Sequence, residues 1–340
     1  MTTTSNAGRD FRLTVLNPEG RDPAQDFSSG INGPNDGEHP PVNFHGYAAC
    51  TGGAYHRDVA RAVAAGQPVL LLLRGDFWRT QRALVALQQK GLPVVVSFKE
   101  TGLHQIARQL EQPKRAARFH AIVEAADGCL AATPETLPFY GTGSFIPTPY
   151  PLHDAHWDFS RPWTERAGIF VGTREWDVPS RRHLAALVLA LELEVPVTVF
   201  DQNPRRCRKR LAALGFSLGS LRILQRRLPY RDYLAEMARH KIVLQADASA
   251  VPGQVAGDAL LCRMPCVGGD GTIDRLGHPA TCGFGRSLGE LDALALRLLQ
   301  DPDFYTATVT ASQEAAREQV GYAAVASKLH RLFQGLTSRA

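Results

Sequence analysis

The sequence lacks any run of about 18 uncharged apolar residues, the minimum that a membrane-spanning helix requires. Its longest apolar stretch, residues 184–200, is interrupted by Glu192 and Glu194. The first ten residues are polar and contain no apolar core of the kind found in signal peptides. We therefore expect a soluble, cytoplasmic protein without a transmembrane segment, and a peripheral contact with a membrane surface stays open.

Standard phosphate-binding motifs are also missing. The chain has neither a GxxxxGK[ST] P-loop nor a complete GxGxxG after a strand, which disfavours a P-loop ATPase and an NAD-dependent dehydrogenase. Its six cysteines form no CxxC pair, and a zinc site would need closer ligand pairs. We expect ordinary reduced thiols and no bound metal.

What the sequence does have is an ordinary globular composition with a mild positive charge. Hydrophobic residues make up 44% and charged residues 21% of the chain, a balance that excludes a wholly disordered protein. The length of 340 residues suggests about two domains. The net charge of +5 suits an anionic ligand such as a nucleotide, and also nucleic acid or an anionic membrane.

Two series of apolar runs alternate with helical patterns. Runs that are apolar throughout, such as residues 69–73, indicate strands covered on both faces, as in a parallel sheet. In the first series, strands are predicted at 11–16, 68–73, 93–98, 129–133 and 144–147, and helices at 56–65, 76–90, 102–126 and 134–140. In the second series, strands are predicted at 168–171, 196–200, 221–224, 241–245 and 265–268, and the final helices near 287–299, 303–317 and 320–334.

Residues 147–166 contain four prolines and separate the two series. We therefore predict an α/β fold of two Rossmann-like, doubly wound domains facing across a cleft, with ligands beyond the carboxyl ends of the strands. Residues 19–55 show little periodicity and are predicted to form one long loop, functional or partly disordered. The predicted organisation is a first Rossmann-like domain at 1–150, a proline-rich linker at 151–166, a second Rossmann-like domain at 167–320, and a C-terminal helix at 321–340 that is a candidate to pack back on the first domain.

The most informative segment is residues 229–269. Its pattern is helix, buried strand, glycine-bearing turn, helix and strand. At the turn, Gly253 would let backbone N–H groups at a helix N-terminus approach a diphosphate. Asp258, one turn into that helix, is placed to reach ribose hydroxyls. A second interpretation is plain helix packing in a Rossmann-like domain.

This segment resembles the C-terminal domain of GT-B glycosyltransferases of the family-four type (glycosyl transferases group 1). Residues 258–267 match that family's Glu-Ala-x-x-x-Gly-x-Pro-Val-Val, with Asp258 for the second Glu of a Glu-x7-Glu motif and Arg263 for the glycine. Ala250 stands where the first Glu usually contacts the donor sugar. The resemblance implies transfer of a hexose from a nucleotide-diphosphate sugar to an acceptor hydroxyl, without cofactor or metal. Retention or inversion of configuration stays open.

The resemblance also implies where the substrates bind. The second domain would bind the donor, with a UDP- or GDP-sugar expected, and the first domain the acceptor. Arg174, with Arg181 or Arg182, would hold the diphosphate through bidentate contacts and offset its charge as it leaves; exposed arginines without a ligand are the alternative. The other candidate donor-binding residues are Gly52, Gly53, Lys99, Tyr230, Pro252, Gly253, Gln254 and Asp258.

Polar residues directly after the apolar strand at 93–98 mark a position that lines the predicted cleft. Here Glu100 or His104 would act as a general base or hold the donor sugar by a hydrogen bond. The alternative is an ordinary helix start followed by an exposed histidine. The candidate catalytic residues are therefore His104, Glu100 and Arg174.

The densest basic run predicts a solvated helix face first, and a patch for nucleic acid or anionic lipid second. No aromatic residue interleaves with it, which argues against a stacking platform for single strands. The acceptor could thus be a glycan, a lipid-linked group, a protein or modified DNA. Two alternatives to a transferase stay open: a sugar-nucleotide epimerase or hydrolase, and a non-catalytic nucleotide- or nucleic-acid-binding protein. The run consists of Arg205, Arg206, Arg208, Lys209 and Arg210.

Overall fold

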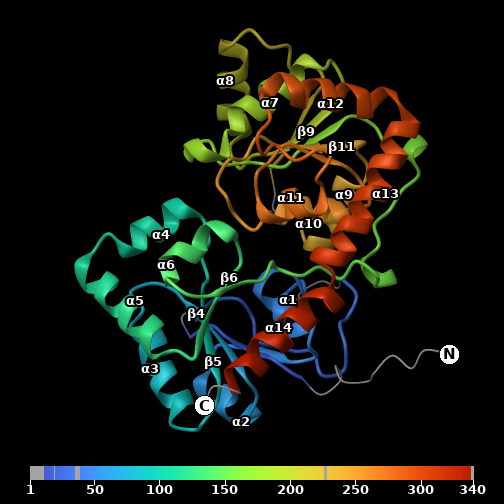
Figure 1. Cartoon of the computed structure of the whole chain (residues 1–340). Helices are drawn as coiled ribbons and strands as arrows, with labels where there is room; N and C mark the ends of the chain where they lie inside the picture. Colours follow the sequence, from blue (N-terminus) through green and yellow to red (C-terminus); the bar gives the residue numbers. More distant parts are fainter. Residues whose placement is uncertain (1–10, 19, 35–38, 226–227, 338–340) are drawn as a thin grey trace, which may run out of the picture. The chain divides into compact units, whose positions relative to one another are not determined.

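The computed structural model describes residues 11–18, 20–34, 39–225 and 228–337 (Figure 1). The polar first ten residues, for which the sequence predicts no signal peptide, lie outside this description. The described chain forms two compact units: one contains residues 11–32, 39–151 and 320–337, and the other contains 33–34 and 152–319 without 226–227. None of the described helices is both long and apolar enough to cross a lipid bilayer.

The first unit is built on a sheet that has seven strands within the described residues, in the order β2-β3-β1-β4-β5-β6-β7. All neighbouring strands are parallel except β2 and β3. Two hydrophobic clusters cover the two faces of β4, which is why its sequence is an unbroken apolar run. The strands are β1 (Thr14–Leu16), β2 (Gln25–Asp26), β3 (Ala54–His56), β4 (Val69–Leu73), β5 (Val94–Phe98), β6 (Gly128–Ala131) and β7 (Ser144–Phe145).

Helices from both ends of the chain cover this sheet. α14, the last helix, places Val325, Leu329 and Phe333 in the same hydrophobic cluster as Leu70 and Leu72 of β4. A 3₁₀ turn at Pro134–Thr136 precedes α6. The helices of this unit are α1 (Asn43–Ala49), α2 (Val59–Ala65), α3 (Trp78–Gln88), α4 (Leu103–Leu110), α5 (Pro113–Ala125), α6 (Leu137–Tyr140) and α14 (Tyr322–Thr337).

Two predictions for the first unit need correction. Residues 19–55, predicted as one loop, contain β2, α1 and β3. The sequence does not reveal α1 because every residue of this short helix except Asn43 is buried, so no apolar and polar faces alternate along it. The single helix predicted at 102–126 is two helices, because Pro113 has no N–H to donate and begins α5.

The second unit has a sheet of five parallel strands among the described residues, in the order β10-β9-β8-β11-β12. β9 and β10 follow on one side of β8, and β11 and β12 on the other. The sheet is therefore doubly wound, as predicted, and its topological switch point lies between β8 and β11. The strands are β8 (Ile169–Val171), β9 (Val197–Phe200), β10 (Leu221–Leu224), β11 (Ile242–Leu244) and β12 (Cys266–Val267).

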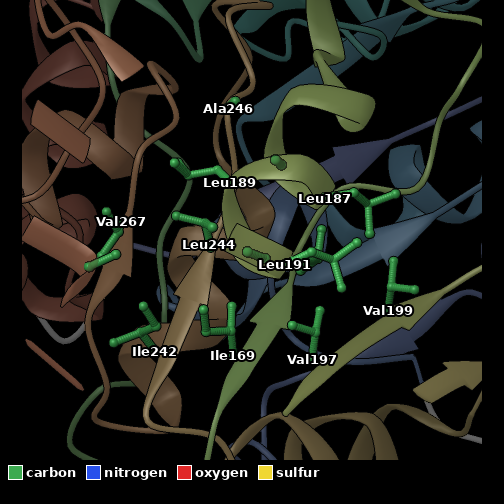
Figure 2. Close-up of a cluster of buried hydrophobic side chains, with 14 of the residues drawn as sticks. Ile169, Leu187, Leu189, Leu191, Val197, Val199, Ile242, Leu244, Ala246 and Val267 are labelled. Atoms are coloured by element: carbon green, nitrogen blue, oxygen red, sulfur yellow. The ribbon is translucent and has the colours of Figure 1, made fainter. Parts of the chain in front are cut away.

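The core of the second unit lies where strand side chains meet Leu187 and Leu191 of α7 (Figure 2). Short 3₁₀ turns at Ala155–Trp157, Trp163–Glu165 and Pro179–Arg181 join the regular elements. The helices are α7 (His183–Glu192), α8 (Pro204–Ala213), α9 (Tyr230–Met237), α10 (Gln254–Leu261), α11 (Thr272–Gly277), α12 (Leu288–Gln300) and α13 (Pro302–Gln319).

A buried arginine fastens the start of the second unit. Arg166 is only 3% exposed, and its guanidinium group donates to backbone carbonyls. In sequence, one of these carbonyls precedes Arg166, and the others directly follow α9 and α10. One side chain therefore links the C-terminal ends of two helices to the segment before β8. The shortest of these bonds are to the carbonyl oxygens of Cys262 (2.7 Å), Arg161 (3.0 Å) and Ala238 (3.1 Å).

We expect Arg166→Met to lower the free energy of unfolding by about 2–4 kcal/mol, because it leaves several buried carbonyls without a donor. Urea denaturation followed by circular dichroism measures this loss. Arg161→Met, at an exposed position five residues earlier, is the control and should stay within about 0.5 kcal/mol of the wild type. Equal losses in the two variants would contradict the role given to Arg166.

Candidate functional site

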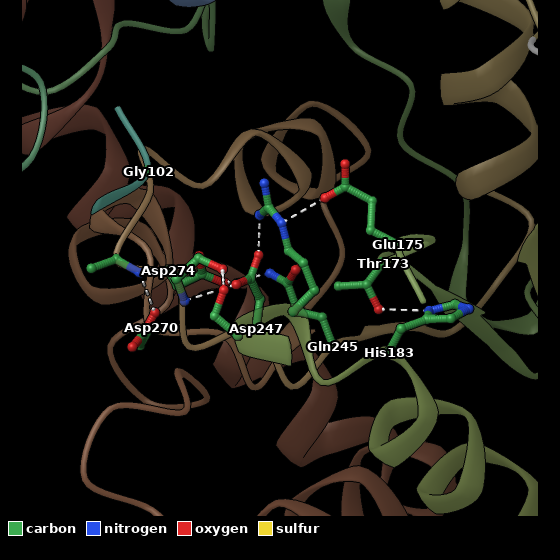
Figure 3. Close-up of polar contacts among 12 residues, drawn as sticks. Gly102, Thr173, Glu175, His183, Gln245, Asp247, Asp270 and Asp274 are labelled. Atoms are coloured by element: carbon green, nitrogen blue, oxygen red, sulfur yellow. Dashed lines mark hydrogen bonds and ion pairs between the residues drawn. The ribbon is translucent and has the colours of Figure 1, made fainter. Parts of the chain in front are cut away.

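The switch point of the second sheet gathers polar side chains from three loops. These loops follow the carboxyl ends of β8, β11 and β12, which are neighbouring parallel strands. Figure 3 shows Glu175 from the first loop, Asp247 from the second and Asp270 from the third in one region. In doubly wound sheets, this edge is where ligands bind.

Asp247 connects the three loops. Its side chain is 7% exposed and forms an ion pair with Nη1 of Arg181, in the loop after β8. Its other carboxylate oxygen accepts from the backbone N–H of Ser249 at 2.9 Å, and its backbone carbonyl accepts from the N–H of Asp270 at 2.9 Å. Arg181, a predicted donor-binding residue, therefore has a defined position at this edge.

The turn before α10 is held in a shape that only glycine adopts easily. Gly253 has φ +89°, and a Cβ atom there would lie 2.8 Å from Oδ2 of Asp274. The carbonyls of Val251 and Pro252 accept from the N–H groups of Thr272 and Ile273, at 2.9 Å each. Gln254, the first residue of α10, is exposed. The predicted turn therefore exists, with the N-terminus of α10 at its end.

Asp274 lies beneath this turn as a buried carboxyl group. Its Oδ1 accepts from Nε2 of Gln245 at 2.7 Å. Burial, and then the negative charge of Asp247, raise its pKa to about 8. The uncharged form of Asp274 therefore predominates at neutral pH, and the group adds little negative charge beside Gly253.

Asp258 is not at the surface, where a ribose-binding role would place it. It is 1% exposed, and its carboxyl group accepts from the hydroxyl groups of Tyr230 and Tyr233 on α9. Burial raises its pKa to about 8, against the opposing effect of the two tyrosines. The structure thus brings the predicted residues Tyr230 and Asp258 together, but in a buried contact between α9 and α10.

Arg174 is exposed in the loop after β8. Burial raises the pKa of Tyr233 well above its ordinary value, and the positive charge of Arg174 opposes this rise. The charge of Arg174 is therefore felt at the Tyr233 hydroxyl group of α9.

In the first unit, Lys99 and Glu100 follow the carboxyl end of β5 as predicted. Nζ of Lys99 is 3.1 Å from Oδ2 of Asp22, and Oε1 of Glu100 is 3.0 Å from Nε of Arg74. His104 is exposed in the first turn of α4. Glu100 is thus already paired with a cation, whereas the side chain of His104 faces solvent.

Gly52 and Gly53 lie at the other edge of this sheet. Gly53 directly precedes β3, and a Cβ atom there would lie 2.0 Å from the carbonyl oxygen of Leu13, which precedes β1. The close approach of two backbones therefore requires glycine at this position. The pair therefore lies away from the carboxyl ends of the strands, where Lys99 and Glu100 are found.

Sequence inspection missed a polar cluster in the region predicted as a loop. The ring of His45, on α1, stacks between those of His39 (3.9 Å) and Tyr55 (3.6 Å). The Tyr55 hydroxyl accepts from Asn17 at 2.8 Å and lies 3.4 Å from Asp22, the partner of Lys99.

Burial, and then the charge of His39, lower the pKa of His45 to about 3, so this ring is neutral. The density of polar residues in 17–56 is the one signal that could have pointed to this polar cluster.

The basic run lies on the exposed side of α8, with Cys207 and Leu211 buried on the other side. Nη2 of Arg206 is 3.5 Å from Oδ2 of Asp177, and the guanidinium group of Arg210 lies 4.9 Å from the ring centre of Trp176. The first interpretation of the run, a solvated helix face, agrees with this placement.

Comparisons with known proteins identify the architecture. No family model and no curated protein matches the sequence. The structure is similar to Anabaena Alr3699/HepE in complex with UDP (TM-score 0.62, 12% identity, covering 96% of this chain and 100% of that one). The chain has the GT-B fold. It is also similar to a UDP-forming trehalose-phosphate synthase from Burkholderia xenovorans (0.56, 12%, covering 82% and 78%) and to a glycosyltransferase from Rickettsia africae (0.57, 9%, covering 83% and 80%).

The buried carboxyl group of Asp258 predicts a pH dependence of stability. An aspartate in the unfolded chain has a pKa of about 3.9, and Asp258 in the folded chain has one of about 8. Between these values the folded state holds a proton that the unfolded state has lost, so the free energy of unfolding falls as pH rises through this window. We expect Asp258→Asn to flatten this fall by up to about 1.4 kcal/mol per pH unit.

Urea denaturation at several pH values between 5 and 8 measures how the free energy of unfolding changes with pH. Asp232→Asn, which changes an exposed carboxylate on α9, is the matched control and should leave the slope unchanged. An Asp258→Asn slope equal to that of the wild type would show that Asp258 is ionised in the folded protein.

Proposed function

We propose that this protein is a glycosyltransferase that moves a hexose from a nucleotide-diphosphate sugar to an acceptor hydroxyl. The observation that carries the proposal is the GT-B fold over nearly the whole chain, shared with a protein that binds UDP. The arrangement of Arg181 and the Gly253 turn at the switch point of the second sheet supports it. The second unit would bind the donor, a UDP-sugar by likeness to these proteins, and the first unit the acceptor.

In this proposal the second unit stabilises the leaving nucleotide. The bond between the sugar C1 and the diphosphate oxygen breaks as the acceptor oxygen bonds to C1, and negative charge grows on the diphosphate. Arg181 and Arg174 offer cations to that charge, and the first N–H groups of α10 offer hydrogen bonds. Because burial raises the pKa values of Asp274 and Asp258 to about 8, their uncharged forms predominate at neutral pH and oppose the anion little.

The acceptor hydroxyl must lose a proton during the transfer. The carboxylate of Glu100 is held in an ion pair with Arg74 and must leave this partner to reach an acceptor hydroxyl. The side chain of His104 is exposed at the start of α4, and its ring nitrogens can accept a hydrogen bond from an acceptor hydroxyl. We therefore assign His104 as the base if the reaction inverts the configuration at C1.

Titration with UDP tests the proposal. We expect UDP to bind the wild type, and Arg174→Ala to lower turnover by about 10²–10³, because it removes a cation from the leaving diphosphate. Calorimetric titration measures the binding of UDP. The rate at which UDP is released from UDP-sugars measures turnover. Release without an added acceptor would favour the sugar-nucleotide hydrolase alternative.

Arg297→Ala, which changes an exposed arginine on α12, is the control and should keep wild-type turnover. If neither UDP nor GDP binds at millimolar concentration, the proposed function is wrong. If UDP binds but no UDP-sugar is turned over, a non-catalytic nucleotide-binding protein remains.

A DNA acceptor is a second candidate, and the exposed cations of α8 are the observation that favours it. If α8 contacts phosphates, affinity for duplex DNA will fall steeply with salt, by about 0.9 in the logarithmic slope for each phosphate contact. Replacing Arg205, Arg208 and Lys209 by glutamine should therefore reduce this slope in gel-shift titrations. Absence of any shift at low salt would exclude α8 as a DNA contact.

A further inference from the structure

The guanidinium group of Arg181 is bound by two carboxylates of very different exposure. Its Nη1 pairs with Asp247, whose side chain is 7% exposed. Its Nε lies 2.9 Å from Oε2 of Glu175, whose side chain is 51% exposed. The arginine itself is 24% exposed, so the side of the guanidinium group that faces Glu175 is the one nearer to solvent.

The two carboxylates are also held differently. Asp247 accepts a second hydrogen bond from Ser249 and is fixed to Asp270 through its backbone carbonyl. Among the described residues, the side chain of Glu175 forms its hydrogen bond and its ion pair with Arg181. Glu175 can therefore leave Arg181 by rotation of its own side chain, whereas Asp247 can leave only if the loop after β11 moves.

The edge of Arg181 that Glu175 occupies is the one that an anion from solvent would use. Arginine binds phosphate oxygens through parallel N–H bonds from one edge of its planar fork. A diphosphate that takes the Nε edge meets the Glu175 carboxylate within ion-pair distance, and the two negative charges repel each other. The two anions cannot share this edge.

We infer that Glu175 holds the phosphate-binding edge of Arg181 until the donor's diphosphate displaces it, while Asp247 keeps the guanidinium group in place. This inference rests on the proposed function, because it takes the diphosphate of a nucleotide sugar as the displacing anion. Glu175 thus sets donor affinity by competing with the diphosphate for Arg181, and it does not touch the reacting atoms. Binding exchanges one carboxylate for one phosphate group, and no covalent bond changes.

The test compares UDP affinity in Glu175→Gln and in the wild type. Glutamine keeps the length of the side chain but removes the charge that competes with phosphate. Since an exposed ion pair of this kind is weak, we expect Glu175→Gln to bind UDP roughly two- to fivefold more tightly. Affinity for uridine, which has no phosphate, should not change.

Asp177→Asn is the matched control, because Asp177 belongs to the same loop and pairs with Arg206 instead of Arg181. It removes the same charge from the same region and should change UDP affinity less than Glu175→Gln does. In the Arg181→Ala background, the gain from Glu175→Gln should disappear, which a double-mutant cycle measures.

The outcomes separate the inference from the proposed function. Equal gains in Glu175→Gln and Asp177→Asn would overturn the exchange and leave only a general effect of charge. A gain for uridine, or one that persists without Arg181, would overturn it as well. Unchanged UDP affinity in Glu175→Gln would overturn the inference alone, whereas absence of UDP binding to the wild type would overturn the proposed function.

Discussion

The ion pair between Asp247 and Arg181 is the contact on which the carboxyl edge of the second sheet depends. Burying an ionised carboxylate such as that of Asp247 costs folding free energy unless a cation and hydrogen bonds compensate its charge. Arg181 supplies the cation, and the backbone N–H of Ser249 supplies a bond. Because Asp247 also accepts from Asp270 through its carbonyl, the loops after β8, β11 and β12 keep one relative arrangement.

Around this pair, the protein limits the negative charge that a phosphate would meet. Asp258 and Asp274 are buried, and their protonated forms predominate at neutral pH, since burial raises both pKa values to about 8. Glu175, in contrast, has an exposed carboxylate, and this carboxylate forms an ion pair with Arg181. Without a ligand, the carboxyl edge of the second sheet therefore has Arg181 paired on both sides. An anionic ligand can take the place of the Glu175 carboxylate.

The sheets could be predicted from sequence more readily than the site. Unbroken apolar runs such as residues 69–73 predict strands covered on both faces, and the parallel sheets confirm them. The same reasoning failed at 19–55, since α1 is buried on nearly all sides and has no polar face. The spacing from the Gly253 turn predicted that Asp258 reaches ribose hydroxyls. Sequence spacing alone does not show that Asp258 is buried against Tyr230 and Tyr233.

The sequence by itself determined two doubly wound α/β units, the glycine turn before α10 and the candidate status of Arg181, because these follow from local periodicity, turn chemistry and motif spacing. Only the tertiary structure decided which charges are buried, paired or open to solvent. Arg181 and Asp247 are 66 positions apart, and Tyr230 and Asp258 are 28 apart. Burial and pairing are properties of neighbours in space, which strand order brings together and local sequence does not specify.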